Sequence, residues 1–245
     1  MYLFTRRSIF IFLISLATTQ LIAQEAFHLQ QLDNRNGLSN SAINCIYQDS
    51  DKLLWIGTWD GLNMYDGSTF HVFNYSKSNN NNSIGSNIIY QILEDNKKNI
   101  WVVTNEGISK YQKNTGKFMH YFYNQSKVRF MQGFLIAVDE SGNIYSSSKS
   151  SNVVNYYDET SDSFKPCVIS NNTKNKIKKI VFEKKSKLWV LKQDGTLKVY
   201  VKNGQKFIDD YYENQIDSVD DFFYVNDEIF FTTYNKRLYK QTNKT

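Results

Sequence analysis

The chain has 245 residues, of which 41% are hydrophobic, 16% aromatic and 22% charged. This composition excludes an intrinsically disordered protein, which would be poor in aromatic residues and high in net charge. The formal net charge is +5, but the lysines are scattered along the chain. Binding to nucleic acid would need a clustered basic stripe, so the charge pattern argues against it.

Residues 1–23 have the features of a secretion signal. Arg6 and Arg7 form a positive start, and a short apolar run follows as far as Ala17. This run is far below the ~20 residues that a membrane-spanning helix needs, which favours a cleaved signal over an uncleaved anchor. No second hydrophobic span follows in the sequence. We therefore expect an exported, periplasmic domain over residues 24–245.

A recurring aromatic residue divides the rest of the chain into units of about 44 residues. Each of these anchors follows an aliphatic residue in a short apolar run. The anchors are Trp55, Trp101, Tyr145, Trp189 and Phe230. Their separations are 46, 44, 44 and 41 residues. A fixed period of this size is the mark of a repeat architecture.

The surroundings of the anchor repeat as well. An acidic residue stands six positions before each of the first four anchors. These acids are Asp49, Asp95, Asp139 and Glu183. Turn-forming residues lie between acid and anchor and suit a tight hairpin. Because one active site would draw different residues from different units, acids at the same place in every unit predict a structural turn.

Four apolar runs separated by turns make up each unit, and in the first they are 42–48, 53–59, 62–66 and 69–75. Four antiparallel strands in this length are typical of one propeller blade. The sequence therefore predicts an all-β protein, a β-propeller with four complete blades and most of a fifth. The expected blades are 38–78, 84–125, 131–170, 176–212 and 216–245. The fifth unit lacks a fourth run, so we expect this sequence to be part of a longer protein.

The best-preserved repeats resemble a known family. The first contains Asn36-Gly37-Leu38-Ser39-Asn40-Ser41 and Leu54-Trp55-Ile56-Gly57-Thr58-Trp59-Asp60-Gly61, and the second contains Trp101-Val102-Val103-Thr104-Asn105-Glu106-Gly107. These segments are similar to two-component regulator propellers, the periplasmic sensor region of hybrid two-component histidine kinases of Bacteroidetes. The resemblance is specific over residues 36–125 and rests on the period alone beyond them.

The resemblance implies a seven-bladed ring and a larger receptor. Members of the family usually continue into a second propeller, a membrane helix and a histidine kinase, and they sense oligosaccharides released from polysaccharides. The expected function is thus a non-catalytic sensor module of a homodimeric receptor, anchored in the inner membrane by segments outside this sequence. Phosphorelay would then regulate the genes that use the glycan. One alternative is a stand-alone exported propeller that binds carbohydrate or a protein; a weaker one is a secreted hydrolase.

Ligand recognition is expected on the face formed by the turns between second and third strands and by the links between blades. These turns lie at 59–61, 105–107, 150–152, 193–195 and 234–236. A hairpin turn has no structural need for an indole, so Trp59 beside Asp60 is a candidate sugar platform, with packing against the next blade as the alternative. Asn105 and Glu106 occupy the corresponding turn of the second unit. No cofactor or metal is expected.

Other polar residues form no pattern of an active site. Hydrolysis of a glycoside would need two carboxylates converging on one bond. The acids at 209–221 lack the alternation and glycine of a calcium loop and indicate a solvated loop. The three histidines have no ligand spacing. Cys45 and Cys167 make no metal motif and are interpreted as small buried hydrophobic residues. The polar segment 76–83 is interpreted as a solvated linker.

Overall fold

The computed structural model describes residues 29–78, 82–121, 133–169, 174–184, 187–204, 206–210 and 216–241. The predicted secretion signal lies outside these ranges. Clustering of contacts separates residues 1–32 from a second unit, residues 33–245, and the features below belong to the second unit. In the described part of the chain, no helix is long and apolar enough to cross a membrane.

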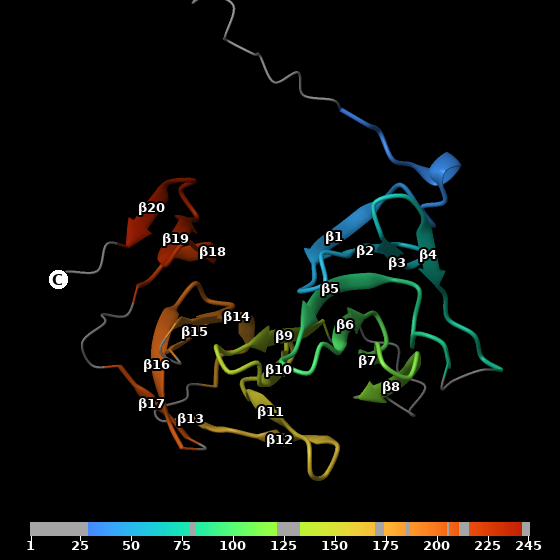
Figure 1. Ribbon diagram of the computed structural model, residues 1–245. Coiled ribbons are helices and arrows are strands. Elements are labelled where there is room, and N and C mark those ends of the chain that lie inside the picture. The colour runs from blue at the N-terminus through green and yellow to red at the C-terminus, as the bar shows by residue number, and fades with distance from the viewer. Residues whose placement is uncertain are drawn as a thin grey trace, which may run out of the picture. The chain divides into compact units, whose positions relative to one another are not determined.

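The described strands form five sheets that follow one another in chain order (Figure 1). The first sheet contains β1 (Ile43–Gln48), β2 (Leu54–Thr58), β3 (Gly61–Tyr65) and β4 (Phe70–Phe73). The second contains β5 (Ile89–Glu94), β6 (Ile100–Thr104), β7 (Ile108–Gln112) and β8 (Lys117–Tyr121). The third contains β9 (Phe134–Val138), β10 (Ile144–Ser148), β11 (Asn155–Asp158) and β12 (Ser163–Pro166).

The fourth sheet contains β14 (Ile177–Glu183), β15 (Lys187–Lys192), β16 (Leu197–Asn203) and β17 (Lys206–Asp209). The short strand β13 (Val168–Ile169) joins the outer edge of this sheet by pairing in parallel with β17. The fifth sheet has three described strands, β18 (Val219–Val225), β19 (Glu228–Thr233) and β20 (Leu238–Gln241). This confirms the predicted all-β propeller with four complete blades and most of a fifth. The closed ring of seven blades stays a prediction.

Each of the four complete blades is an antiparallel meander in which neighbouring strands follow one another in the chain, and the first strand lies at one edge of the sheet. In four blades the first strand shifts register after its first paired residue, as between Ile89 and Gln91 in β5. Side chains of these strands reach the next blade. Asn44 donates a hydrogen bond to the carbonyl of Ile89 at 2.8 Å, and the Gln91 amide donates to the carbonyl of Ile136 at 2.8 Å. These bonds satisfy backbone groups that no strand of the same blade pairs.

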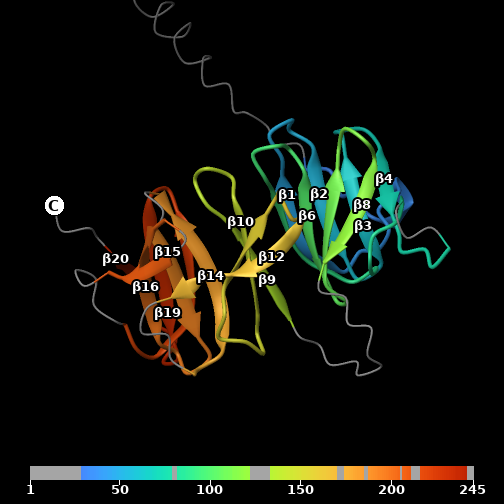
Figure 2. The ribbon, with the colours of Figure 1, turned by 90° about the horizontal axis from the view of Figure 1, so that it is seen from below.

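Aromatic anchors fill the space between consecutive blades, as the repeat predicted. Trp55 and Leu62 of the first blade share a core with Ile89 and Ile92 of the second. Figure 2 shows the sheets of these two blades side by side. The other junctions are built in the same way, around Trp101, Tyr145 and Trp189. All four anchors are at most 3% exposed. Burial of such large rings between consecutive sheets stabilises the packing of one blade against the next.

Gly57 marks the closest approach of the first two blades. A Cβ atom on Gly57 would lie 2.5 Å from Cγ2 of Ile89 and 2.6 Å from Sγ of Cys45. We expect Gly57→Ala to lower the free energy of unfolding by about 1–3 kcal/mol, because the added methyl group overpacks the junction. Urea unfolding measures this effect.

A double-mutant cycle provides the control for this prediction. Ile89→Ala removes Cγ2, the nearest of the atoms that the new methyl group meets, and costs stability by itself. The combined variant should be more stable than the sum of the two single effects predicts. Strict additivity of the two effects would contradict the proposed contact between Gly57 and Ile89.

Candidate ligand-binding site

The repeated acids hold the anchors in place. The indole N–H of Trp55 donates to Asp49 at 2.8 Å, and that of Trp101 donates to Asp95 at 2.8 Å. The same bond joins Trp189 to Glu183 at 2.7 Å and the Tyr145 hydroxyl to Asp139 at 3.3 Å. Three of these acids also accept backbone N–H groups of the turn that follows. The predicted structural role of the acids is confirmed.

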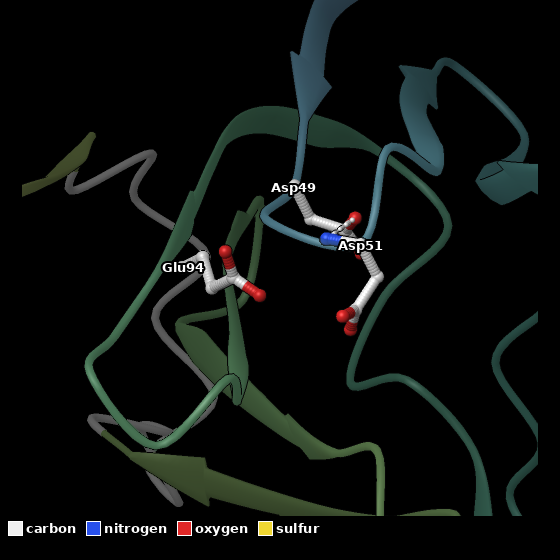
Figure 3. A group of neighbouring side chains, drawn as sticks. All are labelled: Asp49, Asp51 and Glu94. Atoms are coloured by element: carbon white, nitrogen blue, oxygen red, sulfur yellow. Dashed lines mark hydrogen bonds between the residues drawn. The ribbon is translucent and has the colours of Figure 1, made fainter.

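An acidic group lies where the first two blades meet, and Figure 3 shows its carboxylates turned toward one another. Asp49 and Asp51 come from the turn after β1, while Glu94 ends β5. The spacing of their oxygens would suit a metal ion, but the Lys113 ammonium sits among them. It lies 2.7 Å from Asp49, 2.8 Å from Glu94 and 3.1 Å from Asp51. The group is therefore an ionic brace between blades.

In this brace, burial and the ion pairs act in opposite directions on the pKa values of Asp49 and Lys113. Burial would raise the pKa of Asp49, but the bonds from Lys113 and Trp55 hold it below the ordinary value of 3.8. Burial would lower the pKa of Lys113, and its acidic partners raise it above the ordinary value of 10.5. A similar brace recurs further along the chain, where Lys202 lies 3.1 Å from Asp139.

The turn between β2 and β3 exposes the candidate sugar platform. Trp59 is 52% exposed, in contrast to the buried anchor Trp55 on the same hairpin. The carboxylate of Asp60 accepts a hydrogen bond from the Asn87 side chain at 2.9 Å, and Asn87 accepts from the backbone N–H of Tyr75 at 2.7 Å. The ring of Tyr75 is 47% exposed. An exposed indole beside an oriented carboxylate can stack on a sugar ring and accept its hydroxyl groups.

The next turn places Asn105 and Glu106 beside a second exposed ring. The Tyr90 hydroxyl lies 3.5 Å from the Asn105 side-chain oxygen, and Tyr90 is 39% exposed. Glu106 is exposed, and its carboxylate lies 3.5 Å from the Asn105 amide nitrogen. The backbone of Asn105 donates to the carbonyl of Ile88 at 3.0 Å, which fixes the turn on the link between blades.

Sequence reasoning did not single out Tyr75, Asn87 or Tyr90. Tyr75 and Asn87 lie in the link between the first two blades, where the repeat gives no anchor. Tyr90 stands at the register shift of β5 and is 39% exposed. We call Trp59, Asp60, Tyr75, Asn87, Tyr90, Asn105 and Glu106 the aromatic rim.

The remaining predictions on polar residues have mixed outcomes. Both cysteines are free, with Cys167 buried and Cys45 half-buried, and burial raises the pKa of Cys45 to about 11 and that of Cys167 to about 12. Both thiols are thus protonated at neutral pH. The solvated-linker prediction is wrong at Ser83, which is buried and donates to the carbonyl of Ser76 at 3.2 Å.

Two segments of the chain match the model of a family described as two component regulator propeller, residues 37–60 and 83–106. Each segment begins just before the first strand of a blade and continues through the second strand, which contains the anchor. It ends with the first two residues of the turn between the second and third strands. A histidine kinase of Formosa agariphila is 50% identical over 38 residues, which are 16% of this chain and 3% of that protein.

Solved structures with the same fold include both sensors and enzymes. The extracellular domain assigned to a hybrid two-component system of B. thetaiotaomicron matches with a TM-score of 0.65 and 21% identity, over 88% of this chain and 30% of that one. Virginiamycin B lyase from Staphylococcus aureus matches with a TM-score of 0.56 and 10% identity, over 83% and 71%. At these identities the likeness establishes the propeller fold. The two matched segments, at the start of the first two blades, are similar to two-component regulator propeller repeats.

Proposed function

We propose that this chain is the ligand-sensing propeller of a hybrid two-component sensor histidine kinase, exported to the periplasm, and that it detects an oligosaccharide released from a polysaccharide. The observation that carries the proposal is the match of its first two blades to the two-component regulator propeller model. The short segment shared with a histidine kinase and the fold shared with an extracellular sensor domain support it.

The mechanism is non-catalytic. An oligosaccharide that binds one state of a dimeric receptor better than the other shifts the receptor toward that state, and the shift is limited by the difference in affinity. The aromatic rim supplies the binding groups: exposed rings for the apolar faces of sugars, and the side chains of Asp60, Asn105 and Glu106 for hydroxyl groups.

The test is binding of the purified protein to an array of oligosaccharides, from tetrasaccharides to hexasaccharides of plant and algal polysaccharides. We expect Trp59→Ala to weaken binding of the recognised sugar by roughly ten-fold, which corresponds to about 1.4 kcal/mol. Titration calorimetry measures the change. Tyr239→Ala, which removes an exposed ring from the fifth blade, is the control and should leave affinity unchanged. Equal affinity of the Trp59→Ala variant and the parent protein would contradict the platform.

Signalling is tested in the source bacterium. With the Trp59→Ala change in the native gene, the recognised sugar should no longer induce transcripts of the enzymes that degrade its parent polysaccharide. A strain in which the gene is deleted should lose the same response. Normal induction in both strains would contradict the sensor role and favour a stand-alone exported binding protein.

A further inference from the structure

A recess in the surface contains none of the residues of the aromatic rim. It has a volume of about 510 Å³ and is lined by first strands of four blades, together with one residue that follows β10. The lining residues are Gln91, Leu135, Ile136, Lys149, Lys178, Lys179, Ile180, Val181, Asp220 and Asp221. We call this recess the lysine cleft. Its first member, Gln91, follows Tyr90 of the aromatic rim in β5, so the two surfaces share a strand.

Charges in the lysine cleft do not cancel. Lys178 pairs with Asp220 at 2.9 Å, and Lys179 pairs with Asp221 at 2.8 Å. Both pairs join the fourth blade to the fifth. Lys149 has no acidic partner within 4 Å among the described residues, and it is exposed. Three lysines against two aspartates leave one unmatched positive charge in the lining.

Lys149 is held in position by its surroundings. Its backbone N–H donates to the carbonyl of Gly133 at 3.0 Å, and its carbonyl accepts from the Gln193 side chain at 2.6 Å. The aliphatic stem lies along Gly133, where a Cβ atom would be 2.9 Å from Cδ of the lysine. The backbone at Gly133 has φ of +51°, which favours glycine. The backbone hydrogen bonds and the contact with Gly133 position Lys149 so that its side chain lines the cleft.

Apolar groups form the other part of the lining. Ile136 and Ile180 are buried, and Leu135 is half-buried beside them. A surface that combines an apolar floor with donors and acceptors suits a sugar ring, which has C–H faces and polar edges. The two aspartates can accept sugar hydroxyl groups.

We propose that the lysine cleft binds an acidic sugar residue, whose carboxylate or sulfate group pairs with Lys149 while Lys179 contributes a second donor. This assignment rests on the proposed function and adds the charge of the ligand to it. The aromatic rim would hold an uncharged part of the same oligosaccharide. An ammonium paired with an anion in a recess gives a stronger bond than one between neutral groups.

The experiment uses two acidic probes and their neutral counterparts: oligogalacturonate with its methyl ester, and a sulfated galactan oligosaccharide with its desulfated form. Titration calorimetry on the purified protein should find that at least one acidic probe binds, at least ten-fold more tightly than its neutral counterpart. Comparison of the two pairs distinguishes carboxylate from sulfate. Higher salt should weaken the binding, because part of it is electrostatic.

Variants locate the interaction. Lys149→Gln should weaken binding of the acidic probe at least ten-fold and leave the neutral counterpart unaffected. Lys117→Gln, which removes the same charge from an exposed position on the outer strand β8, should change neither. Equal binding of acidic and neutral probes, or full affinity of Lys149→Gln, would overturn the cleft proposal.

The remaining outcomes separate the two proposals. Binding of neutral sugars alone, lost in Trp59→Ala, would overturn the acidic-sugar assignment and leave the sensor proposal standing. If the protein binds none of the four probes and no oligosaccharide of the wider array, both proposals fail.

Discussion

Trp101→Ala is expected to lower the free energy of unfolding by about 3–5 kcal/mol, the range found when a buried tryptophan is truncated. The indole is fully buried between the second and third blades. It stacks on Tyr121 at a centroid distance of 5.4 Å and meets Tyr157 edge to face at 4.7 Å. Its loss also leaves the Asp95 carboxylate without the N–H that it accepts at 2.8 Å.

A lysine adds to the effect at this junction. The Lys110 ammonium lies 5.3 Å from the Trp101 ring centre and 4.7 Å from that of Tyr157, and the residue is only 5% exposed. It donates to the Tyr157 hydroxyl at 2.6 Å and pairs with Asp162 at 3.3 Å. A cation this buried depends on the faces of the rings around it. Truncation of Trp101 therefore removes both packing and a partner of the buried charge.

Two further variants separate these contributions. Trp101→Phe keeps most of the ring and removes one of the two side-chain N–H groups that donate to the same Asp95 oxygen, so we expect a loss of about 1–3 kcal/mol, as for a hydrogen bond to a charged group. Trp59→Ala truncates an exposed tryptophan and should change stability by no more than about 0.5 kcal/mol. Urea unfolding of the three variants gives the comparison. Equal destabilisation by Trp101→Ala and Trp59→Ala would contradict the difference in burial.

The features of the fold that recur in every blade could be predicted from the sequence. Trp55, Trp101, Tyr145 and Trp189 recur at nearly constant spacing, so each supports the assignment of the others, and the acids six residues earlier identify the turn. A propeller junction needs the same large ring in every blade, and the regular period follows from that need. The residues of the aromatic rim do not recur at a constant spacing. Residues that bind a ligand differ from blade to blade, so Asn87 and Tyr90 have no counterpart that could single them out.

The braces were missed for a different reason. Lys113 meets acids that lie 19 to 64 residues earlier in the chain, so its role depends on how two blades face each other. A pattern was nevertheless present, because Lys113 and Lys202 each stand two residues after a tyrosine of the third strand, Tyr111 and Tyr200. Recurrence of a Tyr-x-Lys pattern at one place in two blades could have predicted that both lysines act alike.

Lys113→Met should lower the free energy of unfolding by about 3 kcal/mol at neutral pH, because it removes the partner of buried carboxylates. The side chain of Asp49 is fully buried and that of Glu94 is 8% exposed, while Asp51 is 41% exposed and retains contact with water. Methionine keeps the length of the side chain, so the loss reports the charge. The carboxylate of Asp49 would then face that of Glu94 in a desolvated site, which raises the pKa of Asp49.

The pH dependence gives the sharper test. In the parent protein the pKa of Asp49 is lowered in the folded state, so its contribution is present above about 3.8 and is lost as the pH falls through the lower folded value. In Lys113→Met the pKa of Asp49 is raised in the folded state, so acidification stabilises the variant relative to its own state at pH 7. The difference in stability between the two proteins should therefore shrink as the pH falls from about 7 toward 4.

Two comparisons decide whether the ionic brace is the cause. Lys98→Met removes another ammonium from Asp51, but both side chains of that pair are exposed, so a change of about 0.5 kcal/mol or less is expected. Adding Glu94→Gln to Lys113→Met removes one of the facing charges and should recover part of the lost stability. Urea unfolding at several pH values measures all four proteins. A loss in Lys113→Met that stays the same at every pH would show that packing of the lysine stem, and not its charge, joins the first two blades.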